Sequence, residues 1–168
     1  MTDDDDHELA REAGSALIED DAMVAVAESS TGGLVGSKLT DVPGASGFFE
    51  RSVVTYSNDA KLDLLNVDPH TLEKTGAVSA ETARQMASGV RENAGTKWGL
   101  STTGIAGPGG GSPEKPVGTV FIGTACLQDG EETVSATRYE FEGDRLENKG
   151  EFARQALADL LEAIVAGE

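Results

Sequence analysis

Three hydroxyl side chains, Ser29, Ser30 and Thr31, stand together after a short apolar run and before two glycines. The run at residues 22–27 is typical of a buried strand, and the residues after the glycines are typical of a helix. At such a junction the free amides and the dipole of the helix N-terminus stabilise an anion or a developing alkoxide. One of these hydroxyls is therefore a candidate nucleophile. The alternative is that Ser30 or Thr31 only caps the helix.

A base for such a nucleophile must come from another part of the chain. His7 lies in an acidic segment, His70 follows a proline in a polar turn, and Cys126 lies inside a predicted strand, so none of them favours a Ser–His–Asp or Cys–His site. A desolvated lysine can lose its proton near neutral pH. Two lysines are candidates: Lys61 lies five residues after Tyr56, just past a second predicted strand, and Lys115 lies in a Gly-rich segment. The alternative for any lysine is a surface charge.

Residues 104–118 hold six glycines and three prolines in fifteen positions, which predicts a loop. Glycines let backbone amides approach an oxyanion or a phosphate closely, and prolines make that backbone rigid. The segment matches neither the P-loop nor the dinucleotide-binding fingerprint. It is either a functional loop, as long loops inside compact domains usually are, or a flexible surface loop.

The elements that must position these residues alternate between strands and helices. The periodicity predicts strands at about 22–27, 48–56, 98–103, 117–127 and 133–141, and helices at about 7–19, 34–42, 58–65, 80–93 and 145–165. Asn58 and Ser79 are the expected N-caps of two helices, and residues 128–131 predict a hairpin turn. This order predicts a single-domain, three-layer α/β/α sandwich with a mixed, mainly parallel sheet. The turns after residues 27, 56 and 103 then lie at the carboxyl ends of strands, where such sheets bind ligands.

The chain has 168 residues, with 30 acidic against 13 basic side chains and a formal net charge of −17. This charge argues against binding nucleic acid or an anionic membrane. One cysteine excludes an internal disulfide, and two distant histidines leave no zinc-type spacing, so no metal is expected. We expect one domain over residues 1–168, with residues 1–6 as an acidic leader. The chain shows no signal peptide or membrane span, which predicts a cytoplasmic protein.

The acidic residues are spread along the chain and lysines are few. Such a surface fits a protein adapted to high internal salt, where screening removes the self-repulsion. An ordinary acidic protein is the alternative.

Five motifs along the chain occur in a fixed order, and they are residues 27–33 (AESSTGG), 54–61 (VTYSNDAK), 76–79 (GAVS), 103–108 (TGIAGP) and 113–119 (PEKPVGT). Together they resemble the C-terminal domain of the CinA family, whose characterised members are nicotinamide-nucleotide amidases. The resemblance runs from about residue 8 to residue 163. It implies hydrolysis of nicotinamide mononucleotide to nicotinate mononucleotide and ammonia, in pyridine-nucleotide salvage, with no metal or organic cofactor.

The resemblance also implies roles for single residues. Ser29 matches the family's nucleophile and Lys61 its general base, with Tyr56 close to this pair, and Arg145 matches an arginine that binds the substrate phosphate. Backbone amides of the turn at residues 29–33 or near the end of the third strand are expected to bind the oxyanion. The expected substrate-binding residues are therefore Ser30, Thr31, Gly32, Gly33, Thr103, Gly104 and Arg145.

The chain departs from the family pattern at two positions. Ser30 stands where the family usually has cysteine, and Lys149 stands where it often has a second arginine, which weakens a bidentate phosphate contact there. The larger family members also carry an N-terminal pyrophosphatase-like domain that this sequence lacks, so we expect a stand-alone amidase. A homodimer is expected by analogy with the family and because twofold dimers are the commonest homo-oligomers.

Two other functions stay open from the sequence. A nucleotide-binding module without turnover would use the same Gly-rich pocket, but it has no need to retain a nucleophile and a base together. A structural role in DNA uptake or repair is opposed by the charge of −17.

Overall fold

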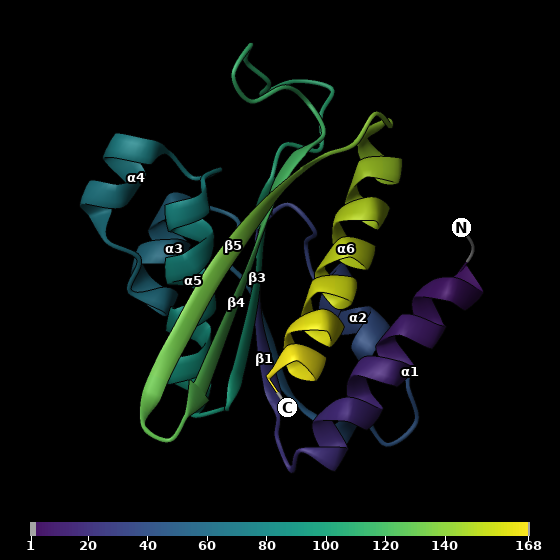
Figure 1. Ribbon diagram of the computed structural model, residues 1–168. Helices are drawn as coiled ribbons and strands as arrows, with labels where there is room; N and C mark the ends of the chain where they lie inside the picture. Colours follow the sequence, from purple (N-terminus) through teal and green to yellow (C-terminus); the bar gives the residue numbers. More distant parts are fainter. Residues whose placement is uncertain (1–2, 168) are drawn as a thin grey trace.

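A five-stranded sheet forms the centre of the computed structural model, which describes residues 3–167 (Figure 1). Its strands follow the order β2-β1-β3-β4-β5, with bounds β1 Val24–Glu28, β2 Phe49–Val54, β3 Trp98–Gly104, β4 Thr119–Gln128 and β5 Glu131–Glu140. β1 pairs in parallel with β2 and β3, whereas β4 is antiparallel to both β3 and β5. Four strands therefore run in one direction, which confirms the mixed, mainly parallel sheet.

Helices cover both faces of this sheet and confirm the α/β/α sandwich (Figure 1). One side carries α1 (Asp3–Glu19), α2 (Leu34–Thr40) and α6 (Arg145–Ala166), and the other carries α3 (Asn58–Leu65), α4 (Pro69–Thr75) and α5 (Ala80–Ala94). A short 3-10 helix, η1 (Ala45–Gly47), precedes β2. Within the described part of the chain, no helix is both long and apolar enough to cross a membrane.

The residues of β1 contribute to cores on both faces of the sheet. Val24 and Val26 belong to the larger core, with α1, α2 and α6, whereas Ala25 and Ala27 belong to a smaller one, with α3 and α5. This division follows from the alternation of side chains along a strand. All five residues of β1 are buried, so the strand holds the turn that follows it in a fixed place.

Glycine permits a close contact that positions α3. A Cβ on Gly89 of α5 would lie 2.1 Å from the carbonyl oxygen of Leu65, at the end of α3. The two helix backbones therefore approach more closely than any side chain at position 89 would allow. Because α3 carries Lys61, this contact bears directly on the candidate site.

Residues 3–6, expected as part of an acidic leader, instead form the first turn of α1. Asp6 is buried, and its carboxylate pairs with Lys38 Nζ at 2.7 Å and with Arg154 Nε at 2.5 Å. Burial opposes ionisation of Asp6, but hydrogen bonds from the two cations outweigh it and lower the pKa of this carboxyl. Ion pairs with α2 and α6 thus anchor the start of α1. Residues 1–2 of the expected leader lie outside the described residues.

Two local expectations from the sequence were wrong. Ser57, not Asn58, caps α3, and its Oγ accepts a hydrogen bond from the Ala60 amide at 3.0 Å. The segment around His70 is a helix, α4, and not a polar turn. Its signal was present in the sequence, because Asp68 is the N-cap and Pro69 occupies the first helical position, where proline is favoured.

The hairpin between β4 and β5 and the N-cap of α5 are as expected. Asp129 and Gly130 form the hairpin turn with φ of 52° and 80°, the left-handed pair that a two-residue turn of type I′ requires. Ser79 caps α5, and Gly95 ends it in a left-handed conformation.

Candidate active site

Ser29 and Lys61 meet at the carboxyl edge of the sheet. Ser29 directly follows β1, and Lys61 lies in the first turns of α3, the helix after the neighbouring strand β2. Lys61 Nζ lies 2.9 Å from Ser29 Oγ. Lys61 is 1% exposed and Ser29 is 8% exposed, so the contact is shielded from water. A hydroxyl and an amine in this geometry can exchange a proton.

The other contacts of Lys61 are to uncharged groups. Nζ donates to the carbonyl oxygens of Thr55 at 2.7 Å and of Tyr56 at 3.2 Å. Within residues 3–167, no carboxylate forms an ion pair with this lysine. Burial lowers the pKa of Lys61 to about 8. When neutral, the amine can donate its two hydrogens to the two carbonyls and direct its lone pair to the Ser29 hydroxyl.

Tyr56 contributes its backbone to Lys61 and its side chain to a different part of the site. The side chain is 63% exposed, and its hydroxyl lies 3.4 Å from Arg145 Nη2. The phenol ring therefore lies on the wall of the site next to the arginine, while the Tyr56 carbonyl accepts the hydrogen bond from Lys61.

A hollow of about 210 Å³ is lined by Ser30, the neighbour of Ser29, and by Tyr56, whereas Ser29 and Lys61 themselves are not part of its lining. Its walls come from the turn after β1, the segment between β2 and α3, the end of β3, the Gly-rich loop and the start of α6. The lining residues are Ser30, Tyr56, Gly104, Ile105, Ala106, Gly107, Gly109, Gly110 and Arg145. A more apolar hollow of about 520 Å³ adjoins it and shares Ala106 and Arg145. The structure thus brings four of the sequence-predicted residues to one hollow, namely Ser30, Tyr56, Gly104 and Arg145.

Arg145 bridges two walls of the hollow from the first turn of α6. Its Nη1 donates to the Gly107 carbonyl of the Gly-rich loop at 2.5 Å, and its Nη2 faces Tyr56. Asp144 fixes the start of α6 as N-cap, because its side chain accepts a hydrogen bond from the Glu147 amide at 2.9 Å. Lys149, one turn further along α6, directs Nζ toward the turn after β1, 3.8 Å from where a Cβ on Gly32 would lie.

Thr31, Gly32, Gly33 and Thr103 lie outside the lining of the hollow, and the Gly32 amide donates to the Ser29 carbonyl at 3.1 Å. Thr31 is buried; its hydroxyl donates to Glu28 Oε1 at 2.7 Å and shares a hydrogen bond with the Thr102 hydroxyl at 2.8 Å. The Gly33 amide also donates to Glu28 Oε1. Thr103 Oγ1 donates to the Ala77 carbonyl at 2.7 Å. Each of these groups therefore has a partner within the protein.

The turn after β1 keeps other donors free. Within the described chain, the amides of Ser30 and Thr31 donate no hydrogen bond, and the buried Oγ of Ser30 has no partner either. The first amides of α2, by contrast, are occupied by Glu28. Of the oxyanion donors expected in this turn, Ser30 and Thr31 are thus available, whereas the helix N-terminus is not.

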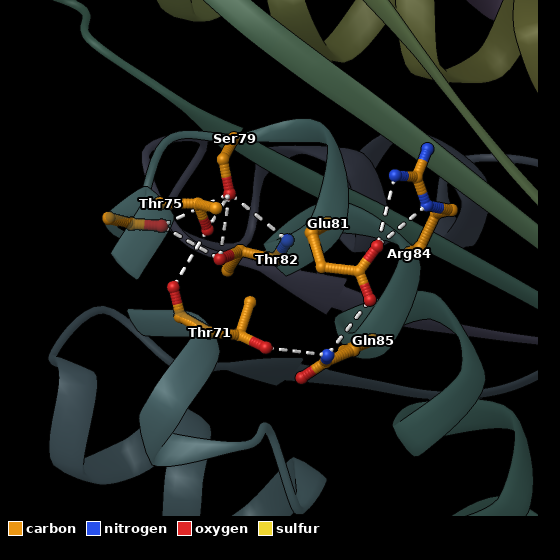
Figure 2. A network of polar contacts seen from close by, with 8 residues as sticks. Thr71, Thr75, Ser79, Glu81, Thr82, Arg84 and Gln85 are labelled. Carbon is orange, nitrogen blue, oxygen red and sulfur yellow. Dashed lines mark hydrogen bonds and ion pairs between the residues drawn. The ribbon is translucent and has the colours of Figure 1, made fainter. Parts of the chain in front are cut away.

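The motif at residues 76–79 lies in a polar network that joins α4 to α5 (Figure 2). Ser79 Oγ accepts from the Thr82 amide at 3.1 Å and lies 3.1 Å from Thr75 Oγ1. Gln85 of α5 donates to Thr71 Oγ1 of α4 at 2.8 Å. The network fixes the segment whose Ala77 carbonyl accepts the hydrogen bond from the Thr103 hydroxyl.

The Gly-rich loop is fastened at both of its ends. Lys115 Nζ donates to the Thr75 carbonyl at the end of α4, at 3.0 Å. On the other side, the buried Asn148 of α6 donates to the Ala106 carbonyl at 3.0 Å. The loop is therefore held by α6 near its start, where it lines the hollow, and by α4 near its end.

Sequence reasoning missed two buried polar residues that hold the site together. Glu28 accepts the hydrogen bonds of the turn after β1, and Asn148 connects α6 to the Gly-rich loop. Glu28 left a signal, since a carboxylate that ends an apolar strand must be paired or hydrogen-bonded if it is buried. Asn148 left none, because it is one polar residue among many near the start of α6.

Comparisons with known proteins agree on one family. The family model for the CinA C-terminal domain matches residues 6–164. A CinA-like protein of Chlorobaculum tepidum is 58% identical over 146 residues, which cover 86% of this chain and 34% of that protein. A CinA-like protein of Salinibacter ruber is 51% identical over 146 residues, covering 87% and 34%. The chain thus spans about a third of the length of these curated relatives.

Solved structures give the same result. The competence/damage inducible protein CihA from Agrobacterium tumefaciens superimposes with a TM-score of 0.87 and 41% identity, covering 95% of each chain. A CinA superfamily protein from Klebsiella pneumoniae gives a TM-score of 0.89 and 32% identity, covering 96% of this chain and 98% of the other. Sequence and fold together establish that the chain belongs to the CinA C-terminal domain family.

Proposed function

We propose that this domain is an amidohydrolase that deamidates nicotinamide mononucleotide to nicotinate mononucleotide and ammonia, in the cytoplasm and as part of pyridine-nucleotide salvage. The observation that carries the proposal is the 2.9 Å contact between Ser29 Oγ and a buried Lys61 whose pKa burial lowers to about 8. A serine is a poor nucleophile unless a base removes its proton, and a lysine is a base only when neutral.

The proposed reaction proceeds through an acyl-enzyme. Neutral Lys61 takes the Ser29 hydroxyl proton as Oγ bonds to the carboxamide carbon. The C–N bond then breaks, and Lys61 gives the proton to the leaving nitrogen, which departs as ammonia. Water attacks the resulting ester with Lys61 again as base, the bond from carbon to Oγ breaks, and Ser29 recovers its proton. The free amides of Ser30 and Thr31 are the proposed donors to the oxyanion.

Cationic side chains at the start of α6 support an anionic nucleotide as the substrate. Arg145 lines the hollow and Lys149 lies one helical turn away, near Gly32. In a chain with a net charge of −17, two cations beside a candidate nucleophile are a marked local exception. We assign the substrate phosphate to Arg145, which offers bidentate hydrogen bonding, with Lys149 as a second, single charge.

The decisive experiment measures ammonia release from nicotinamide mononucleotide in molar KCl. The native protein is compared with Lys61→Met, and Lys74→Met serves as the matched control because Lys74 is an exposed lysine on α4. We expect release by the native protein and by the control, and a loss of about 10³-fold or more for Lys61→Met.

Two results would count against the proposal. If Ser29→Ala releases ammonia at the native rate, Ser29 is not the nucleophile. Absence of release by the native protein, with the nucleotide still bound in calorimetry, favours a nucleotide-binding module without turnover.

A further inference from the structure

Glu28 is the last residue of β1 and immediately precedes the candidate nucleophile. Its side chain is fully buried. Its carboxylate accepts five hydrogen bonds, at Oε1 from Thr31 Oγ1 (2.7 Å), Gly33 N (3.1 Å) and Val35 N (2.9 Å), and at Oε2 from Gly36 N (3.0 Å) and Ser52 Oγ (2.5 Å). A buried carboxylate is tolerated only when it is satisfied in this way.

The five donors come from both sides of the turn after β1. Four of them belong to residues 31–36, which lead into α2, and the fifth belongs to Ser52 of the neighbouring strand β2. Within residues 3–167, no cation pairs with Glu28, so its charge is stabilised by amide and hydroxyl donors and by the first turn of α2. One side chain therefore determines the path of the backbone from β1 into α2.

This path also fixes the groups that the proposed reaction needs. The Ser29 amide donates to the Thr102 carbonyl at 3.1 Å, and Thr31 shares a hydrogen bond with the Thr102 hydroxyl, so β3 holds the turn from the other side. With Thr31 directed to Glu28, the amides of Ser30 and Thr31 have no acceptor within the described chain.

We propose that Glu28 is a positioning residue for the hydrolysis, because it holds the turn that presents Ser29 Oγ to Lys61 and keeps the Ser30 amide free. It acts through these residues and does not contact the substrate, since none of its side chain is exposed. The inference rests on the proposed function for its kinetic consequences, but its effect on Ser29 can be measured without any nucleotide.

Glu28→Gln is the most informative variant because it preserves volume and replaces one acceptor oxygen of the carboxylate with an NH₂ donor. The oxygen of a glutamine can still accept from three of the donors. Its NH₂ group then faces the Gly36 amide, which can only donate and cannot accept a hydrogen bond. The first turn of α2 must shift to separate two donors. Glu73→Gln is the matched control, because Glu73 is an exposed glutamate on α4.

The first measurement is labelling of Ser29 by a fluorophosphonate, followed by mass spectrometry. The reagent forms a bond between phosphorus and Oγ with loss of fluoride and a proton, so its rate reports the reactivity of Ser29 independently of the natural substrate. We expect Glu28→Gln to be labelled about 10²-fold more slowly, the effect of a misplacement of about 1 Å. The midpoint of its labelling rate against pH should stay at that of the native protein, because Lys61 is untouched.

The second measurement separates catalysis from binding. For Glu28→Gln, kcat should fall by the same factor as labelling, while the Kd for nicotinamide mononucleotide stays within about twofold of native. A purely structural weakening of the fold would instead lower the melting temperature and affect binding and kcat together. Native labelling of folded Glu28→Gln at Ser29 overturns the inference.

Two further variants decide the case in which Glu28→Gln does not fold. Thr31→Val and Ser52→Ala each remove one donor to Glu28 and leave the carboxylate in place. Slower labelling in both supports the inference, and native rates in both overturn it. If the native protein is labelled at Ser29 but releases no ammonia, the proposed substrate fails while the role of Glu28 in positioning Ser29 is still measured.

Discussion

At the scale of single residues, the proposed role of Lys61 predicts that the activity depends on pH in a defined direction. Burial lowers the pKa of Lys61 to about 8, and only the neutral amine can accept the Ser29 proton. We expect kcat/KM to rise with pH, with about a tenth of the maximum at pH 7, half at pH 8 and a plateau above about pH 9. A pH profile of ammonia release checks this. A rate that falls as pH rises through 8 contradicts the role of Lys61 as base.

The same lysine links pH to stability. Its pKa is lower in the folded protein than in the unfolded chain, where it has its ordinary value of 10.5. Between these two values the unfolded chain binds more protons, so the Lys61 contribution to the free energy of unfolding increases with pH from about 8 to about 10.5. We expect the melting temperature of the native protein, relative to that of Lys61→Met, to rise across this window. A difference that is constant with pH would show that folding leaves this pKa unchanged.

Arg145 is expected to affect the phosphate of the substrate more than the reacting amide. Arg145→Lys keeps the charge but loses the planar guanidinium, whose two terminal nitrogens contact Gly107 and Tyr56. We expect KM for nicotinamide mononucleotide to rise about 10-fold, the loss of one charge-assisted hydrogen bond. Nicotinamide riboside, which lacks the phosphate, is the control substrate, and its kcat/KM should change little. An equal loss of kcat/KM for both substrates would show that Arg145 does not act through the phosphate.

Site residues could be predicted from the sequence where their positions follow from neighbouring residues, and not where they depend on residues far away in the chain. Ser29 and Lys61 each follow a strand, and parallel strands end at the same edge, so the alternation of elements placed both at this edge. The resemblance to the family, and not the periodicity, selected Lys61 among the lysines. Thr31 is adjacent to Ser29, yet whether it faces a substrate or Glu28 is decided by Thr102, which lies far away in sequence. The direction of a side chain within a turn is set by such tertiary contacts and not by residue type.

At the scale of elements, the distance between α3 and α5 is expected to control the position of Lys61. In Gly89→Ala the new Cβ would lie 2.1 Å from the Leu65 carbonyl oxygen, so the helices must separate. We expect a loss of about 1–3 kcal/mol in the free energy of unfolding and a lower kcat. Chemical denaturation and ammonia release measure the two effects.

Gly150→Ala is the matched control for this change. Gly150 is also a helical glycine, but a Cβ there would have no atom within 4 Å beyond its chain neighbours and the backbone of its own helix. We expect this variant to gain about 0.5–1 kcal/mol from the better helix propensity of alanine, with native activity. Equal effects of the two substitutions would mean that helix propensity, and not the contact with α3, governs position 89.

The elements themselves were largely predictable because their signals are repeated along the chain. Every strand and the long helices were found from periodicity, and the hairpin from Asp129 and Gly130. α4 was missed because Leu72 is its one apolar side chain apart from Pro69, which leaves no apolar period, although Asp68 and Pro69 mark its start. The start of α1 depends on Asp6 meeting Lys38 and Arg154, which no local pattern reveals.

At the scale of the whole molecule, the net charge of −17 predicts that salt stabilises the fold. Like charges on the surface repel one another more in the compact state than in the expanded chain. In molar salt the screening length falls to about 3 Å, which removes most of this repulsion. We expect the melting temperature to rise between dilute buffer and molar KCl. A melting temperature that does not rise would favour an ordinary acidic protein with no dependence on salt.

Because the sheet has a direction, the candidate site lies at one end of the molecule, and the other end is expected to tolerate an attached group better. Ser29 and Gly104 lie at the carboxyl edge of the parallel strands, whereas the hairpin turn at Asp129 and Gly130 lies beyond the opposite edge, next to the start of β3 (Figure 1). Asp129 in this turn is exposed and already carries a side chain at a positive φ. This turn is therefore the natural attachment point for a fluorescent reporter, an affinity tag or a solid support. A protein immobilised there would present its open hollow to the solution.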